Sequence, residues 1–471
     1  MSGAIVLNAH NIEVLPFNIS PNNLSIHKKI NDHARVNFTA LVPEGEKDKY
    51  VQQTKSQTAI EIKYVDSAES TCLFKGMITH IEVRATRDVY CVYVEAVSYT
   101  YNLDVKLKKR SFQNKDMTYK KLIDEVMEGY SGDYKDTASE GKNTGKFIIQ
   151  YDETDWTFLK RMASHFNTGL VADVSSDKPK FWFGIPEGSG KGKLEEFNYS
   201  VSKKIDDFRV SSENYIDGID EKDFIYYKVV TDKLINIGDT ISFENKSLFV
   251  SESVAYISEG VLLHEYTLTP KKGMSQNLIL NENVLGASVE GKVLEIKEDK
   301  LRLHLDEIDE DQKKDEAFWF PYSTYYTTEG QTGWYCMPEL DDYVKLYFPS
   351  NKEEEGVVIN SIRKRTKGGD FIKDPEVKFF RTKFGKEIMF NEKEIMITGK
   401  DEEVLIRLVG EEGIEIYSKK DIKIKADKGI SIESGKTIQI SAGSKINLKC
   451  KDSQIEMNGV TTIKGSKVKT N

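Results

Sequence analysis

Short runs in which apolar and polar residues alternate occur throughout the first 280 residues, and this alternation is typical of β-strands with one buried face. Valine, isoleucine, threonine and aromatic residues dominate the runs, as expected of strands. The pattern predicts a strand-rich region, with strands at residues 36–42, 59–64, 77–83, 89–96, 146–151, 180–183, 224–230 and 262–268.

Two segments replace this alternation with helical spacing. In residues 119–128, five apolar side chains recur at intervals of three and four, and Gly129 is suited to end the helix. Residues 155–167 show the same spacing, and Gly169 follows as the expected glycine after the helix C-terminus. Two short helices among many strands predict α+β insertions in a mainly β region rather than βαβ units.

Between residues 285 and 366 the pattern changes to five short strands, a number and length that fit a small closed barrel of the OB kind. Polar composition predicts a flexible loop at 187–193, a linker at 271–283 and a solvated acidic loop at 306–316. The five strands are expected at residues 287–297, 301–305, 317–321, 343–348 and 356–362.

The C-terminal segment contains a repeat in which two apolar residues flank one polar residue. The pairs recur every eight residues, and the last pair follows after one extra residue. Residues i and i+2 of a strand share a face, so each pair puts two apolar side chains on one side and one polar side chain on the other. The paired residues are Ile414 and Ile416, Ile422 and Ile424, Ile430 and Ile432, Ile438 and Ile440, Ile446 and Leu448, and Ile455 and Met457.

An eight-residue unit cannot bury its apolar side by itself, and one chain would supply too few rungs for a stable solenoid. Three identical chains wound about one axis would bury all the pairs and leave no free lateral strand edge. The repeat therefore predicts a homotrimeric, triple-stranded β-helix, a stiff needle with these residues on its axis. The alternative is a single-sheet meander or an aggregation-prone tail.

Length, net charge and cysteine spacing limit the classes of function that the chain can have. The 471 residues suggest about three domains, and a net charge of -9 with a pI near 5.6 argues against nucleic acid as a partner. No apolar run approaches the length of a transmembrane helix, and the N-terminal residues lack the pattern of a signal peptide. We therefore expect synthesis in the cytoplasm. The four cysteines share no spacing typical of disulfide or zinc sites.

The familiar catalytic and ligand-binding patterns are missing from the sequence. Seven histidines show no zinc-ligand spacing, and residues 188–193 lack the spacing of a phosphate-binding loop. Asp152, Glu153 and Asp155 precede or open a helix, where capping is a better explanation than glycoside hydrolysis. We predict no catalytic residue, no metal site and no cofactor.

Nine lysines between residues 419 and 451 make the outside of the expected needle basic. Solubility and protection of strand edges are the favoured explanation. Attraction of anionic polymers of a cell envelope is the other explanation.

Several segments resemble the VgrG spike of type VI secretion systems and the fused hub and central spike of contractile phage tails and tailocins. The sequence RSFQ at 110–113 is the most specific of them, and at 151–170 an acidic residue precedes a helix with the pattern FL-x-R. Asp341 or Asp342 stands where these proteins commonly have glycine. The matching segments are residues 74–81, 98–113, 151–170, 238–250, 262–268, 333–348 and 382–390.

The resemblance implies a mainly β chain in three parts. Residues 1–280 would form a hub of two tube-like β-barrels with α+β insertions around 110–200. Residues 285–366 would form the OB-fold barrel, and residues 375–471 the trimeric β-helix needle.

The resemblance also implies a function. The trimer would nucleate the inner tube and baseplate, puncture a target envelope, and leave the cell with the contractile particle after assembly in the cytoplasm. Its partners would be the inner tube protein, baseplate proteins and a separate PAAR-like tip protein that contacts Val468, Thr470 and Asn471, while effector cargo stays open.

No lysozyme domain fits between barrel and needle, and no effector domain is expected after the needle. The alternative is a tailspike-like protein that binds or degrades polysaccharide.

Overall fold

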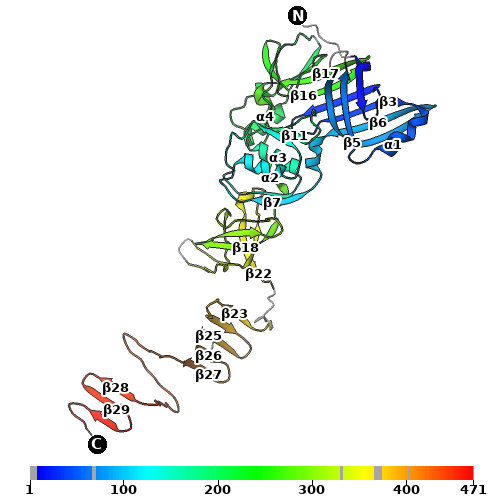
Figure 1. The fold of residues 1–471 in the computed structure, drawn as a ribbon. Helices are drawn as coiled ribbons and strands as arrows, with labels where there is room; N and C mark the ends of the chain where they lie inside the picture. The colour runs from blue at the N-terminus through cyan, green and yellow to red at the C-terminus, as the bar shows by residue number, and fades with distance from the viewer. Residues whose placement is uncertain are drawn as a thin grey trace. The chain divides into compact units, whose positions relative to one another are not determined.

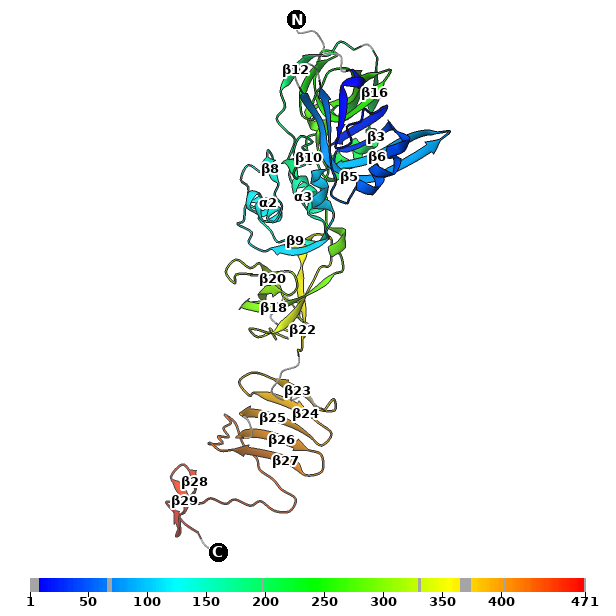
Figure 2. The same cartoon turned by 45° about the vertical axis from the view of Figure 1, so that its right-hand side comes forward.

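The computed structural model describes residues 8–65, 70–196, 198–328, 332–364, 374–400 and 403–469. The chain divides into two compact units, residues 1–364 and residues 365–471. Strands dominate both units, as the ribbons in Figure 1 and Figure 2 show.

The largest element of the first unit is a twelve-stranded sheet. Ten of its strands follow the order β1-β4-β5-β6-β3-β2-β16-β17-β14-β13, and β15 joins β16 to β12. Strands β2 and β16 pair antiparallel, with Lys29 opposite Glu252 and His27 opposite Val254, and thereby join the two halves of the sheet. The strands are β1 (Ile12–Leu15), β2 (Asn23–Lys29), β3 (Arg35–Val42), β4 (Ala59–Val65), β5 (Ser70–Thr86), β6 (Val89–Ser98), β12 (Gly190–Lys193), β13 (Tyr199–Lys203), β14 (Ile225–Thr231), β15 (Thr240–Phe243), β16 (Lys246–Ser258) and β17 (Val261–Thr269).

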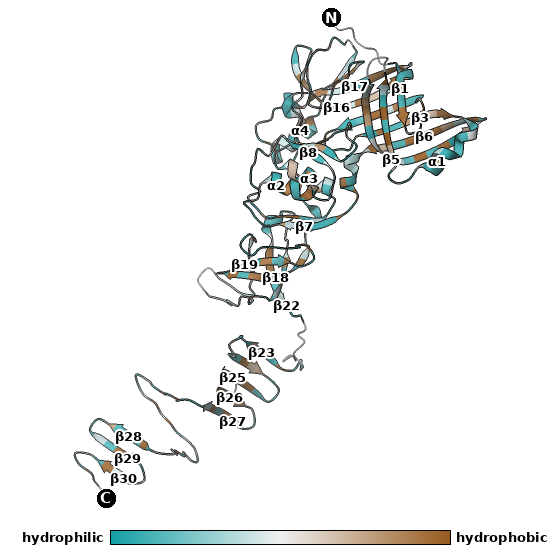
Figure 3. Cartoon of the chain, in the orientation of Figure 1, coloured by the Kyte–Doolittle hydropathy of each residue, from teal (hydrophilic) through white to brown (hydrophobic). Residues whose placement is uncertain are grey.

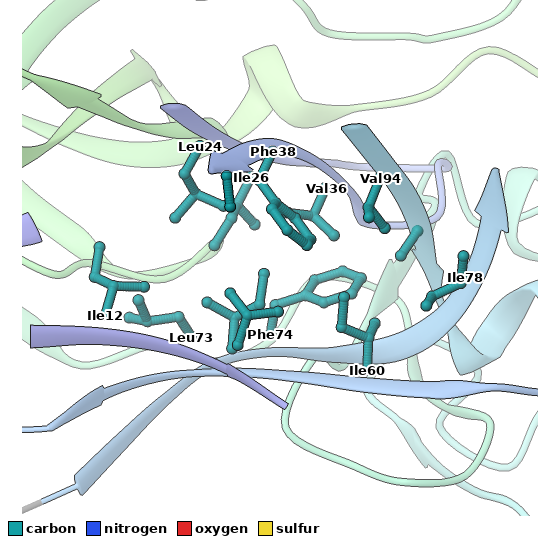
Figure 4. Close-up of a cluster of buried hydrophobic side chains, with 14 of the residues drawn as sticks. Ile12, Leu24, Ile26, Val36, Phe38, Ile60, Leu73, Phe74, Ile78 and Val94 are labelled. Carbon is teal, nitrogen blue, oxygen red and sulfur yellow. The ribbon is translucent and has the colours of Figure 1, made fainter. Parts of the chain in front are cut away.

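Each half of the sheet curls around its own apolar core. In the first half, alternate residues of six strands point inward, and Phe38 and Phe74 lie at the centre with 1% and 0% of their surface exposed (Figure 4). In the second half, Tyr266, Phe243 and Val250 occupy the corresponding place. The alternation that predicted the strands therefore also selects the buried face.

An α+β insertion lies between the two halves along the chain. Helices α2 (Tyr119–Met127) and α3 (Asp155–Ser164) pack their apolar sides on β10 (Leu170–Ala172) and β11 (Lys180–Phe183). Strands β7 (Lys108–Phe112) and β9 (Ile148–Glu153) pair antiparallel, and β8 (Asp133–Asp136) runs parallel to β11. Two further helices, α1 (Lys47–Gln53) and α4 (Ile205–Asn214), were not predicted.

The five strands predicted after residue 285 are all present. They form an antiparallel sheet in the order β20-β19-β18-β21-β22, and a parallel bridge between Tyr322 and Val358 brings its two edges together. Asp341 adopts a φ of 69°, the left-handed conformation that favours glycine, so the turn forms despite the missing glycine. The strands are β18 (Ser288–Lys297), β19 (Lys300–Leu305), β20 (Trp319–Pro321), β21 (Tyr343–Tyr347) and β22 (Val357–Ile362).

The second unit consists of two antiparallel meanders. The first contains β23 (Lys378–Arg381), β24 (Glu387–Phe390), β25 (Glu394–Lys400), β26 (Val404–Val409) and β27 (Gly413–Ser418). The second contains β28 (Ile446–Cys450), β29 (Ser453–Met457) and β30 (Thr461–Lys464). Residues 419–445, all of them described, form no strand within this single chain.

Three local predictions were wrong. Residues 190–193 of the expected flexible loop form β12, which pairs in parallel with β15. The second helix ends at Ser164 rather than at 167, because Asn167 takes up a φ of 49°. Gly169 is therefore not the glycine that ends the helix.

The reason for a glycine at 169 is close packing. A β-carbon there would lie 2.5 Å from the Asn31 side-chain oxygen and 2.6 Å from a methyl group of Ile30. That Asn31 oxygen accepts a hydrogen bond from the Leu170 amide at 2.9 Å, so it is not free to move.

We expect Gly169→Ala to lower the free energy of unfolding by about 1–3 kcal/mol, because the added methyl group forces the Asn31 hydrogen bond apart. Urea unfolding measures the change. The matched control is Gly45→Ala, where no atom lies within 4 Å of the new carbon. Equal stability of the two variants would contradict this account of the glycine.

Candidate functional site

Two features of the chain are candidates for function. The first is a joint, defined here as the contacts of β7, β9 and α3 with the five-stranded sheet β18–β22. The second is an uncovered apolar face on β23–β27.

The centre of the joint is an aromatic side chain from one element inside the core of another. Phe147, immediately before β9, is fully buried among residues of the five-stranded sheet. Its ring centroid lies 5.0 Å from that of Phe320 and 6.2 Å from that of Phe348. Ile149 is buried in the same core. The α+β insertion and the five-stranded sheet therefore share one hydrophobic core rather than meeting through a linker alone.

A buried ion-pair triad lies beside this core. Arg161 of α3 donates to both carboxylate oxygens of Glu153 at 2.9–3.0 Å and to both of Glu353 at 2.9 Å. It also donates to the Ile149 carbonyl at 2.7 Å. All three charged residues are 5% exposed or less, and Asn281 donates to Glu153 at 3.2 Å. Arg161 is the arginine of the FL-x-R pattern, and Glu353 is the partner that sequence reasoning missed.

The RSFQ segment forms the other side of the joint. Ser111 and Gln113 donate to the Asp309 carboxylate at 2.5 and 2.9 Å, and the Leu305 amide donates to it at 2.8 Å. Gln113 also donates to the Leu303 carbonyl at 3.1 Å and accepts from the Phe318 amide at 3.0 Å. Burial raises the pKa of Asp309, although these donors oppose the shift. The acidic loop 306–316, predicted as solvated, thus supplies a structural carboxylate.

Arg110 of the same segment pairs with Asp155, which is fully buried at the start of α3. Lys108 donates to Asp155 at 2.6 Å and Tyr130 donates at 2.7 Å. Burial acts to raise the pKa of Asp155, but the charge of Arg110 and these hydrogen bonds outweigh it and hold the pKa low.

The prediction that Asp152, Glu153 and Asp155 serve the helix start needs correction. Thr154 is the N-cap, since its side chain accepts from the Thr157 amide. Glu153 and Asp155 instead form the buried ion pairs of the joint. Both carboxylates are fully engaged by cationic partners, an arrangement that holds structure together rather than one that transfers protons.

Two of the histidines have structural partners in the first unit. His33 is buried, bonds Thr100 and the Asp104 carboxylate, and lies 4.5 Å from the Trp156 ring. His165 is bonded to the Tyr119 hydroxyl at 2.7 Å. Among the residues that the structure describes, no group of three or more histidine, cysteine, aspartate or glutamate side chains could hold a metal ion.

The second candidate feature is the uncovered face of the first meander. Cross-strand pairing aligns nine large apolar side chains in two rows on one face of β23–β27, and they are 37–73% exposed. Figure 3 shows hydrophobic residues in brown along these strands, between hydrophilic ones in teal. One row is Phe380, Ile388, Ile397, Ile406 and Ile416, and the other is Phe390, Ile395, Leu408 and Ile414.

The opposite face of the same sheet is mixed, because cross-strand pairing places Phe379, Met389, Met396 and Leu405 on it beside charged side chains. Arg407 donates to Glu394 at 2.6 Å and to Glu415 at 3.0 Å, and Arg381 pairs with Glu387 at 3.0 Å. The sequence pattern identified only Ile414 and Ile416 among these nine residues. The other seven were not predicted to share a face, because uneven hairpin turns break the spacing of eight residues. The sequence nevertheless contains the pattern of a strand with one apolar face, since apolar residues of this face lie two positions apart along a strand.

The residues predicted for the needle axis lie in three settings. Ile414 and Ile416 lie on β27, and the last four, from Ile446 to Met457, lie on β28 and β29. The six isoleucines from 422 to 440 lie in the segment without strands and are 53–74% exposed. Strands were expected there, and none forms in a single chain because the chain alone offers no neighbouring edge to pair with. Val468 is exposed, whereas Thr470 and Asn471 lie outside the described residues.

We expect Arg161→Met to lower the free energy of unfolding of the first unit by about 3–5 kcal/mol, because it leaves Glu153 and Glu353 buried without a cation. Thermal unfolding monitored by circular dichroism measures the change. Arg35→Met is the control, because Arg35 and Asp32 form an exposed pair 3.9 Å apart. A loss no larger than that of the control would contradict the role of the triad.

His165 makes the joint region sensitive to acid. Burial, with the charges of Lys146 and Arg161, lowers the pKa of His165 from 6.5 to about 3. Below pH 6.5 His165 is therefore protonated in the unfolded chain but neutral in the folded chain. The free energy of unfolding falls as the pH falls. Between pH 7.5 and pH 5.5 we expect the wild type to lose about 1 kcal/mol relative to His165→Gln. Parallel stability curves for the two proteins would contradict a buried neutral imidazole.

Comparison with known families and structures places these features in context. Residues 49–168 match the family of phage tail baseplate hub proteins (GPD). That segment includes β7, α2 and α3, which carry the RSFQ sequence and Arg161. No curated protein matches the chain at the level of sequence. In the described residues, no helix is long and apolar enough to cross a membrane.

Solved structures match over most of the chain. A chain of the half-lidded PdpA–VgrG complex of Francisella has a TM-score of 0.56 at 10% identity, over 86% of this chain and 87% of that chain. The lidless form of the complex gives 0.55 at 10% identity, over 86% and 97%.

The Escherichia coli c3393 protein gives a TM-score of 0.51 at 12% identity, over 75% of this chain and 100% of that chain. It is described as a type VI secretion component with structural similarity to the T4 tail proteins gp27 and gp5. The chain thus carries a phage tail baseplate hub domain over residues 49–168 and has the fold of VgrG-like hub and spike proteins.

Proposed function

We propose that the protein is the hub and spike of a contractile injection machine and that it works as a homotrimer. The observation that carries the proposal is the uncovered apolar face of β23–β27. The family match over residues 49–168 and the VgrG-like fold support the hub and spike assignment.

The energetics of that face favour self-association. Burying these nine large apolar side chains would lower the free energy by about 25 cal/mol for each Å² of apolar surface removed from water. Exposed apolar patches of this kind mark interaction sites. The opposite face also carries apolar residues, among them Phe379, Met389 and Met396, but these are partly buried within the single chain, and Arg407 and Arg381 pair there with glutamates. Three copies with the more exposed apolar faces turned to a common axis would bury those faces and leave the ion pairs on the outside.

The octad repeat extends this arrangement beyond β27. Residues 419–445 make no strand in one chain, yet their isoleucine pairs continue the eight-residue spacing that starts at Ile414 and Ile416. Strand formation there needs partner edges, and two further copies provide them. We propose that residues 375–471 form the needle, residues 285–366 an OB-type barrel and residues 1–280 the hub.

The joint suits a machine that transmits thrust. Phe147 in a shared core and Arg161 between two carboxylates connect the hub insertion to the barrel without a flexible linker. Load applied to the hub would reach the barrel through buried contacts, which resist shear because interiors are close-packed.

The remaining expectations belong to the same proposal. We infer a structural, non-enzymatic role, assembly in the cytoplasm, and contacts with the inner tube protein, with baseplate proteins and with a PAAR-like tip protein near Val468. The comparisons give the alternative of a tailspike-like polysaccharide enzyme no support.

The test is the mass of the full chain in solution, which we expect to be three times 53.7 kDa. Ile430→Asp would place three carboxylates on a dry axis, where unpaired charge is costly, so the trimer should dissociate or its needle should fray. Ser431→Asp is the matched control, because its side chain lies on the opposite side of the strand and should leave the trimer intact. A stable monomer of the wild type, or equal behaviour of both variants, would refute the proposal.

A further inference from the structure

The segment 419–469 carries more lysine than its own acidic residues can neutralise. It contains twelve lysines and five carboxylates, a formal net charge of +7, whereas the whole chain carries -9 and the other residues therefore carry -16. The lysines are Lys419, Lys420, Lys423, Lys425, Lys428, Lys436, Lys445, Lys449, Lys451, Lys464, Lys467 and Lys469.

The structure leaves this charge open to solvent. All twelve lysines are exposed, and within the described residues 419–469 one ion pair forms, between Lys445 and Glu456 at 3.3 Å. Pairing inside the segment cannot remove the surplus in any arrangement, because at least seven lysines of each chain have no carboxylate left to meet. Solubility alone does not call for a surplus of one sign, since interspersed charges of both signs also keep a surface soluble.

The alternation of the repeat fixes where the charge lies. Lys423 stands between Ile422 and Ile424, so in the strand proposed for the trimer its side chain would point away from the apolar side. In the trimer, on which this inference rests, isoleucines fill the axis and the lysines lie outside. The three segments together then present 21 surplus positive charges.

The composition of the segment indicates what these charges recognise. It contains no arginine and no aromatic residue. Proteins that bind single-stranded nucleic acid use aromatic side chains to stack on bases, and arginine provides bidentate contacts to phosphate and guanine. Lysine alone provides diffuse attraction to a dense layer of phosphate, as at the surface of an anionic membrane.

We propose that the outer surface of residues 419–469 binds anionic phospholipid headgroups. Each lysine within about 10 Å of the membrane surface adds to the attraction, because screening is incomplete over that distance. The other residues, with a net charge of -16, are repelled by the same surface. This division of charge would favour approach to a bilayer through the needle segment.

Co-sedimentation of the full chain with vesicles tests the proposal, with phosphatidylglycerol vesicles compared with vesicles of phosphatidylcholine alone. We expect binding to the anionic vesicles that falls as salt is added. Changing Lys423, Lys425 and Lys449 together to glutamate should weaken it by at least about tenfold. The matched control changes three exposed lysines of the first unit, Lys106, Lys115 and Lys178, to glutamate and should leave vesicle binding unchanged.

Equal binding to both vesicle types, or equal losses in both triple variants, would overturn the proposal. Displacement from the vesicles by duplex DNA at equal phosphate concentration would also overturn it, because the needle would then bind polyanions in general. The mass of every variant is measured in parallel. A trimer without vesicle binding refutes this inference alone, whereas a wild-type monomer refutes the proposed function.

Discussion

An apolar sheet face cannot remain in water, and much of the second unit follows from that constraint. Strands β23–β27 expose two rows of isoleucine, leucine and phenylalanine side chains, while the opposite face carries arginine–glutamate pairs beside partly buried apolar residues. Pairing between these strands within one chain leaves the first face uncovered. Residues 419–445 of the octad repeat form no strand in the single chain. The proposed threefold assembly would cover the exposed face and supply partner strands, and it would explain why a regular, strongly apolar sequence has so little burial here.

The first unit buries its apolar clusters within a single chain. Its five apolar clusters close within one chain, and one of them joins the α+β insertion to the five-stranded sheet through Phe147. Beside that core Arg161 meets two carboxylates and Asp309 accepts three hydrogen bonds. The chain therefore combines a part whose cores close internally with a part that its copies would complete in the proposed trimer.

Periodicity predicted the strands and helices well where local pattern decides the structure. The five strands of 285–366 and the helix starting at Tyr119 occur where alternation and helical spacing placed them. The joint could not be predicted, because the pairing of Arg161 with Glu353 spans 192 residues and no local signal connects them. Strand β12 was missed because its glycine-rich residues, Gly190–Lys193, have low strand propensity and pair only through β15. Asp341 shows the converse, since a residue that argued against the turn adopts the required conformation.

The order of these parts along the chain has a consequence for biosynthesis. Cores that close within residues 1–364 can form while the ribosome is still translating the tail, because domains fold as units from the N-terminus. The apolar rows of β23–β27 and the octads without strand partners emerge after these cores. Neighbouring nascent chains on one messenger would then be the nearest available partners. Translation order itself would then act as a safeguard against misassembly.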